Sequence, residues 1–328
     1  MSGIVAKLRG GRSVAAQGKL SLDREKAREK LRKFRLPDPH YYVLQFVRAA
    51  ATLGATKVEF QVDSDELHCR FDRTIPPELL ADLWGVAFEE REGADAIAAH
   101  HLALGLGSAQ ALNPALITVE SGGQRLRLEG ERETVEPHGG GDFTHIYLKE
   151  KFRFGHLVEF FTRMDGGFPE VKALRDHCQY SSGEIRCNGA LINRSLSNLK
   201  LQAPFESATE RGFAGLLRGL AHTRFHFLRD NVEVSLVMAS NHGAAGLVVA
   251  DCDLLLTDLS GMSLIQDATY DRVLRDVFYD QYHGVLLRWA KSAESTLAAQ
   301  IQLAAEIFDY VGLLKNAGHP TPPNTQAL

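Results

Sequence analysis

Between residues 42 and 53, apolar side chains recur at the i, i+3, i+4, i+7 and i+8 positions of a helix. The members of this stripe are Val43, Phe46, Val47, Ala50 and Ala51. Residues 57–62 then alternate between polar and apolar, which predicts a strand with one buried face. A second face of the helix carries Gln45, Ala49 and Thr52. If the chain has an active site, we expect this second face to line it.

The same patterns extend into a first unit that ends near residue 150. The predicted strands are 57–62, 67–71, 116–120, 124–129 and 143–149, and the predicted helices are 42–53, 76–88 and 94–112. Gly105 and Gly107 interrupt the last of these helices and predict a glycine loop over residues 104–108. Helices collected on one side of a largely antiparallel sheet make an α+β fold, a two-layer α/β sandwich.

A second α/β unit is expected to begin near residue 151. Asn188-Gly189 is a strong two-residue hairpin signal, and a second hairpin is predicted over 223–238. Short strands are predicted at 247–250 and 254–257, followed by a long amphipathic helix over 267–290. The expected parts are a flexible N-terminus (1–19), two domains (20–150 and 151–291), a C-terminal helix (292–316) and a disordered tail (317–328).

Composition excludes several classes of protein. The net charge of −4 gives no reason to expect nucleic acid as a partner. No apolar run reaches the roughly 18 residues that span a bilayer, so we expect no membrane segment. The four cysteines, Cys69, Cys178, Cys187 and Cys252, form no C-x-x-C pair, which argues against a zinc site. Reduced thiols in a cytoplasmic protein are the expected state.

The order of the elements over residues 20–150 resembles the GHKL ATPase superfamily. Its members include the ninety-kilodalton heat-shock chaperone, the ATPase subunit of DNA gyrase, the mismatch-repair ATPases and the histidine kinases. Residues 47–58 are similar to the first helix-to-strand unit of the mismatch-repair branch, 104–121 to the glycine loop and next strand, and 141–150 to the closing strand of the chaperone branch. The resemblance implies a GHKL-like ATPase-type domain, followed by a transducer-like α/β domain.

The catalytic positions of that family are replaced here. Family members carry a glutamate that activates water and, four residues on, an asparagine that ligates magnesium; the matching positions are Gln45 and Ala49. A neutral amide cannot act as a general base, and a methyl group cannot ligate magnesium. The resemblance therefore implies no catalytic residue and no metal ligand. A helix kept only for its packing stripe is the alternative explanation.

The resemblance also implies contacts to a nucleotide. The matching positions are Asp72, Thr74, Gly105, Gly107, Ser108 and Thr144. Asp72 would receive the adenine amino group, although the two glycines that follow it in the family are absent and an ungapped match places Arg70 there. The glycine loop would present backbone N–H groups to phosphate, and residues 89–94 stand where the family has a nucleotide lid. A surface turn, a packing turn and an ordinary strand residue remain the alternatives at Asp72, the glycines and Thr144.

Three functions follow as hypotheses. The first is a GHKL-like pseudo-ATPase that binds ATP or ADP weakly or not at all, without magnesium, and acts as a regulatory or protein-interaction module. The second is an active chaperone-like ATPase with relocated catalytic groups. The third is a structural oligomerisation module, because apolar residues in the last helix alternate spacings of four and three like a coiled-coil seam. This seam consists of Leu297, Ile301, Ala304, Phe308 and Val311. Packing on the helix over 267–290 is one interpretation of the seam, and contact with a partner or with a second copy in a homodimer is the other.

Overall fold

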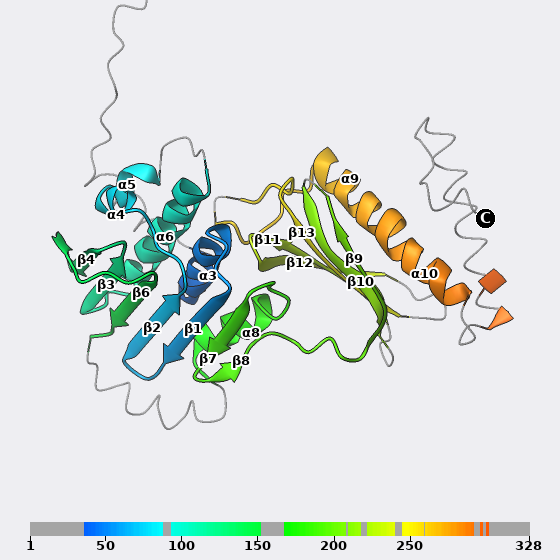
Figure 1. Ribbon diagram of the computed structural model, residues 1–328, viewed down its shortest axis with the longest axis horizontal. Coiled ribbons are helices and arrows are strands. Elements are labelled where there is room, and N and C mark those ends of the chain that lie inside the picture. Colours follow the sequence, from blue (N-terminus) through cyan, green and yellow to red (C-terminus); the bar gives the residue numbers. More distant parts are fainter. Residues whose placement is uncertain are drawn as a thin grey trace, which may run out of the picture.

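Two β-sheets stand next to one another in the computed structural model, each covered by helices (Figure 1). The structure describes residues 36–87, 93–151, 167–207, 209–217, 222–239, 245–258, 260–291, 296–297 and 300–301. Outside these ranges lie the N-terminus predicted to be flexible, the tail predicted to be disordered, residues 89–92 of the predicted lid and most of the predicted C-terminal helix. Of the predicted seam, only Leu297 and Ile301 are described, and both side chains are exposed.

The first sheet has eight strands among the described residues, in the order β5-β4-β3-β6-β2-β1-β7-β8. Their bounds are β1 (Lys57–Val62), β2 (Glu66–Phe71), β3 (Leu116–Ser121), β4 (Gln124–Glu129), β5 (Arg132–Pro137), β6 (Thr144–Lys149), β7 (Glu184–Cys187) and β8 (Ala190–Leu191). Within the described chain, β1 and β7 pair in parallel and the other neighbours are antiparallel, as the largely antiparallel prediction requires. The predicted α+β sandwich is therefore present. Strand β5 escaped prediction because its side chains are mostly polar and exposed.

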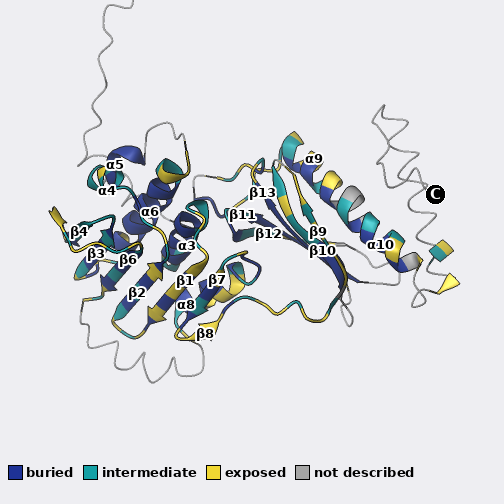
Figure 2. Cartoon of the chain, viewed as in Figure 1, coloured by how far each residue is buried: buried dark blue, intermediate teal, exposed yellow. Residues whose placement is uncertain are grey.

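Helices cover one face of this sheet. They are η1 (Pro39–Tyr41), α3 (Tyr42–Thr52), α4 (Pro77–Ala81), α5 (Leu83–Val86), α6 (Ala94–Ala111) and α8 (Pro169–His177). Asp38 begins the first turn by accepting a hydrogen bond from the backbone N–H of His40, and Pro39 follows at the first helical position. The predicted helix over 42–53 is confirmed as α3, which is buried on nearly every side against α6 and the sheet (Figure 2).

The predicted glycine loop over 104–108 is wrong, because α6 runs through both glycines without a break. A Cβ added at Gly105 would lie 2.6 Å from the ring carbon Cε1 of Phe46 on α3. The glycine therefore allows α3 and α6 to approach closely. A sequence pattern does not separate this use of glycine from a turn, since both require a residue without a side chain.

The first sheet continues past the expected domain boundary at residue 151. Strand β7 pairs with β1, Lys57 aligning with Glu184, and α8 packs beside α3. Asn188-Gly189 forms the predicted hairpin between β7 and β8, with Asn188 and Gly189 at positive φ. The first sheet therefore runs to Leu191, and the core cluster beneath it also includes Val232 and Met262 from later in the chain.

The second sheet has the strand order β12-β11-β13-β10-β9 in the described chain. Its strands are β9 (Leu199–Glu206), β10 (Glu210–Leu217), β11 (Thr223–Arg229), β12 (Val232–Ala239) and β13 (Gly246–Cys252). The predicted hairpin over 223–238 is β11–β12, whereas the predicted strand at 254–257 is reduced to a single bridge between Thr257 and Leu264.

A nearly continuous helical segment covers one face of the second sheet (Figure 1). It consists of α9 (Ala268–Asp276), a π-helical turn η3 (Val277–Tyr282) and α10 (His283–Ala290), and it confirms the long helix predicted over 267–290. None of the helices in the described ranges is long and apolar enough to cross a membrane. All four cysteines lie in the described residues, where they are buried and form no disulfide with one another.

Candidate functional site

The family's base position lies in a closed polar cluster between the two units. Gln45 on α3 is fully buried. Its Nε2 donates a hydrogen bond to the backbone carbonyl of Ser260 at 3.1 Å, and its Oε1 lies 3.1 Å from Nδ1 of His101 on α6. Ser260 belongs to the segment after β13, about 215 residues further along the chain. Both ends of the amide are therefore engaged by the protein itself.

One turn further along α3, Arg48 makes a second bond to the same segment. Its Nη2 donates to the carbonyl oxygen of Gly261 at 2.5 Å, and the side chain is 1% exposed. Burial lowers the pKa of the guanidinium to about 10, although the Asp230 carboxylate acts in the opposite direction. Gly261 has a φ of +70° and leaves no room for a Cβ beside the guanidinium. This close approach requires glycine at position 261.

Asp230 reaches the cluster from the turn between β11 and β12. Its Oδ2 lies 3.4 Å from Nε2 of His101. Burial would raise the pKa of the carboxyl, but the hydrogen bond and charge of His101, together with Arg229 and Arg48, hold it at about 2. Asp230 is therefore ionised at neutral pH and compensates the buried charge of Arg48.

A carboxylate beside an imidazole is chemistry for proton transfer. Here the second nitrogen of His101 faces the amide of Gln45, and the chain of contacts ends on the backbone carbonyl of Ser260. The hydroxyl of Ser260 donates instead to Asp258 at 2.6 Å. The arrangement presents no nucleophile and no base to a bound substrate, so its evident effect is to join the two units.

Magnesium does not fit this site. Ala49, at the family's metal-ligand position, is fully buried and offers a methyl group to a hard cation that requires oxygen ligands. No group of three or more His, Cys, Asp or Glu side chains able to hold a metal ion occurs among the described residues.

Asp72, which the resemblance matches to the adenine contact, forms hydrogen bonds within the protein instead. Its carboxylate accepts hydrogen bonds from the backbone N–H groups of Thr56 and Lys57, at 2.9 and 3.2 Å, and from the hydroxyl of Thr56. The carboxylate therefore fixes the turn between α3 and β1, as in the surface-turn interpretation. Thr74 lies half-buried two residues beyond.

Thr144 is buried at the start of β6, next to that segment. Its Oγ1 donates to the carbonyl of Arg73 at 2.8 Å and lies 2.8 Å from Oγ of Ser121. Ser121 in turn accepts a hydrogen bond from the backbone N–H of Ile75 at 2.7 Å. The two hydroxyls hold residues 73–75 against the sheet, and sequence reasoning found only one of them.

Gly105, Gly107 and Ser108 lie elsewhere, in the interior of α6. Only the first four N–H groups of a helix lack intrahelical partners, so those at 105–108 are not free to receive a phosphate. Ser108 is buried, and its hydroxyl has no hydrogen-bond partner among the described residues. The six predicted nucleotide contacts therefore lie in two places. Asp72, Thr74 and Thr144 are near the end of β2 and the start of β6, whereas Gly105, Gly107 and Ser108 are inside α6.

Sequence reasoning gave no role at this site to the residues around Gln45, which are His101, Arg48, Asp230, Ser260 and Gly261. One signal was present, because Arg48 is the only charged residue in the helix predicted over 42–53. Its partners follow more than 180 residues later, and no local pattern connects them.

No protein-family model and no curated protein matches this sequence. Solved structures do match. The ATPase region of Saccharomyces cerevisiae topoisomerase II is 9% identical over 83% of this chain and 85% of that chain, with a TM-score of 0.46. The B-subunit of DNA gyrase from Myxococcus xanthus is 11% identical over 80% of this chain and 92% of that chain, with a TM-score of 0.47.

A third match is the ATPase domain of the mismatch repair endonuclease MutL from Aquifex aeolicus. It is 10% identical over 73% of this chain and 98% of that chain, with a TM-score of 0.37. At these values the likeness concerns the arrangement of helices and sheets alone. All three are GHKL ATPase domains, the superfamily that the sequence of this chain resembles.

Proposed function

We propose that this chain is a GHKL-fold pseudo-ATPase that acts as a regulatory or protein-interaction module. One observation carries the proposal: Gln45, at the family's base position, is held between His101 and the backbone of Ser260. A substrate water at this position would first have to displace the chain's own segment.

Displacing that segment has a high energetic cost. Arg48 would lose its bond to Gly261 while remaining in a buried environment. A hydrogen bond to a charged group typically contributes about 1.5–3 kcal/mol. The closed cluster therefore opposes both nucleotide entry and the alternative of an active ATPase with relocated groups.

Strand β12 offers a surface for a protein partner. It is an edge strand of the second sheet, and Leu236 and Met238 on it are 42% and 58% exposed. An open strand edge with apolar side chains can accept a further strand from another protein. This feature supports an interaction role for a protein with a closed site.

Calorimetric titration with ATP and ADP, each with and without magnesium, tests the proposal. We expect no saturable heat and no thermal shift, since a ligand at about 100 times its Kd would add roughly 2.7 kcal/mol of stability. A magnesium-dependent ATPase rate that disappears in Gln45→Ala would refute the proposal. A rate that is equal in Gln45→Ala and elutes with the chain in size-exclusion chromatography would favour relocated catalytic groups and would also refute the proposal, whereas a rate that separates from the chain belongs to a copurifying enzyme.

Light scattering tests the homodimer that the C-terminal seam predicts. Leu297 and Ile301 are 72% and 62% exposed, so in the described chain nothing covers them. We propose that they contact a second copy. A dimer that becomes a monomer when the chain ends at Lys291 would support this contact, and a monomer in both cases would remove it.

A further inference from the structure

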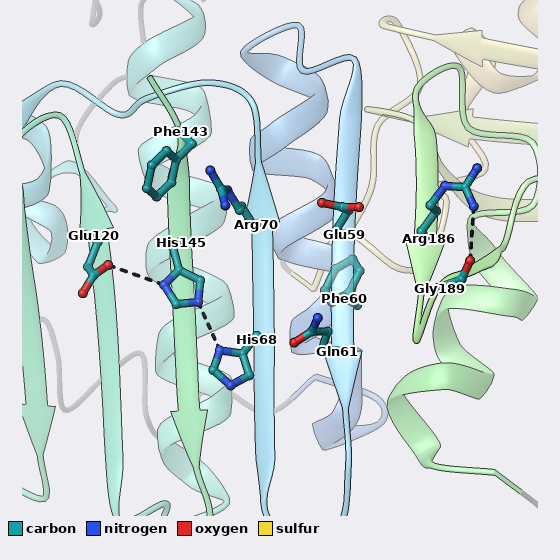
Figure 3. A pocket seen from close by; sticks show the side chains of 10 residues that line it. All are labelled: Glu59, Phe60, Gln61, His68, Arg70, Glu120, Phe143, His145, Arg186 and Gly189. Carbon is teal, nitrogen blue, oxygen red and sulfur yellow. Dashed lines mark hydrogen bonds and ion pairs between the residues drawn. The ribbon is translucent and has the colours of Figure 1, made fainter. Parts of the chain in front are cut away.

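The outer face of the first sheet, opposite the helices, carries a row of charged side chains. Strand pairing aligns Glu120 with His145, His145 with Arg70, Arg70 with Glu59, and Glu59 with Arg186. The row crosses β3, β6, β2, β1 and β7, and the intervening residues of these strands face the core. Figure 3 shows these side chains around a cavity of about 400 Å³.

Most charges around this cavity already have partners. Glu59 binds Lys57 at 2.7 Å, Glu120 binds Arg125 at 2.6 Å, and Arg186 binds Glu184 at 2.7 Å. Because Glu59 and Glu120 are engaged in these ion pairs, neither carboxylate of the row pairs with Arg70, the central residue.

Arg70 is the exception in the row. Although Glu59 is its cross-strand neighbour, Arg70 forms no ion pair with any described residue. Its guanidinium lies 4.0 Å from the ring centroid of Phe143, and Gly141 leaves the space in which that ring sits. A cation stacked on an aromatic ring is held in place without being neutralised. The N–H groups of the Arg70 guanidinium are therefore available to a ligand in the cavity.

Two histidines form the neighbouring wall. Nδ1 of His68 lies 3.1 Å from Nε2 of His145, and Nδ1 of His145 lies 3.5 Å from Oε2 of Glu120 (Figure 3). If His145 donates to Glu120, then its Nε2 must accept from His68. This chain of contacts orients both rings. Gln61, paired across the strands with His68, adds an exposed amide.

We propose that this cavity binds a small molecule bearing a carboxylate or phosphate group, with Arg70 as the anchoring residue. The planar guanidinium matches two oxygens of such a group, and its stacking on Phe143 reduces the side-chain entropy lost on binding. The site lies on the opposite face of the sheet from the α3–α6 cluster, so it is independent of whether the chain binds nucleotide.

The test is a titration of the full chain with inorganic phosphate and, separately, with succinate, followed through the imidazole NMR signals of His68 and His145. Sodium chloride at matched ionic strength serves as the reference. We expect saturable shifts with at least one probe, and the tighter probe identifies the group. Arg70→Met keeps an unbranched side chain against Phe143 and should weaken binding about tenfold or more, since a charge-assisted hydrogen bond contributes about 1.5–3 kcal/mol.

The matched control is Arg127→Met, which removes an arginine from β4 outside the cavity, where it pairs with Glu129. Its titration should equal that of the wild type. Equal affinities for the wild type and Arg70→Met would overturn the proposal, and so would shifts no larger than those from sodium chloride. Unchanged circular dichroism and melting temperature in Arg70→Met would exclude misfolding as the cause of lost binding.

Discussion

Replacing Gly105 by alanine should destabilise the protein, although alanine is the better helix former. The added Cβ would lie 2.6 Å from Cε1 and 2.9 Å from Cδ1 of Phe46, and 3.2 Å from Cβ of Gln45. Carbon atoms normally pack about 3.5–4.0 Å apart. Phe46 is fully buried and Gln45 is fixed by its hydrogen bonds, so neither side chain can move aside freely.

Two opposing terms set the size of the effect. Overpacking a core costs about 1–3 kcal/mol. The change from glycine to alanine inside a helix returns up to about 1 kcal/mol. Because the added Cβ meets the ring of the fully buried Phe46, the cost should lie at the upper end of its range, so the net loss should be about 2 kcal/mol. Urea unfolding followed by circular dichroism measures it as a lower midpoint with an unchanged slope.

Two controls make the result specific to the helix contact. Gly139 has open space around it and no positive φ, so Gly139→Ala should change stability by no more than about 1 kcal/mol. In a Phe46→Leu background the smaller side chain should reduce the cost of Gly105→Ala, which a double-mutant cycle detects. Stabilisation by Gly105→Ala, as in an exposed helix, would refute the close α3–α6 contact.

Three further outcomes are expected. The pKa of Asp230 is lowered from an ordinary 3.8 to about 2, so its carboxylate should contribute about 2 kcal/mol to the free energy of unfolding. This contribution is present above about pH 4 and is lost as the pH falls through the lowered pKa. Asp230→Asn should therefore remove this acid sensitivity of the urea midpoint. The hydrogen bond to Glu170 raises the pKa of His40 above 6.5, so the charged imidazole stabilises the folded protein. This stabilisation is present below pH 6.5 and is lost as the pH rises through the raised pKa. Glu170→Gln should therefore make the melting temperature less dependent on pH in that range. Gly246→Ala should cost about 1–3 kcal/mol in urea unfolding, because its Cβ would meet the buried ring of Tyr282.

Each outcome has a contrary result. An acid profile of Asp230→Asn identical to that of the wild type would mean that the carboxylate is not held by the cluster. A pH dependence that persists in Glu170→Gln would separate His40 from Glu170. A stable Gly246→Ala protein would show that η3 can shift away from β13.

The strands of the first sheet were predictable because one face is buried and the other solvated. Val58, Phe60 and Val62 alternate with polar residues, and this alternation defines β1. The positions of Gln45 and Ala49 on one helix face were equally predictable from helical spacing. The resemblance to a known family then identified them as the positions that lack a base and a metal ligand.

The remaining features depend on contacts that sequence spacing does not reveal. Gly105 predicted a loop because glycine serves turns and close helix contacts equally well. The continuation of the first sheet past residue 151 was not predictable, because β7 pairs with β1 after a long separation in sequence. Likewise, the bonds of Arg48 and Gln45 to the segment at 260–261 join parts of the chain that no periodic pattern relates.

The parallel pairing of β1 with β7 has a consequence for synthesis and for truncated chains. Strand β1 pairs with β2 on one side, and on the other side it can pair with β7 only after residues 184–187 have been synthesised. Until then, β1 is an open edge, and such edges template aggregation. A chain ending at residue 150 would keep that edge permanently, so we expect it to aggregate more readily than a chain extending through Ile192.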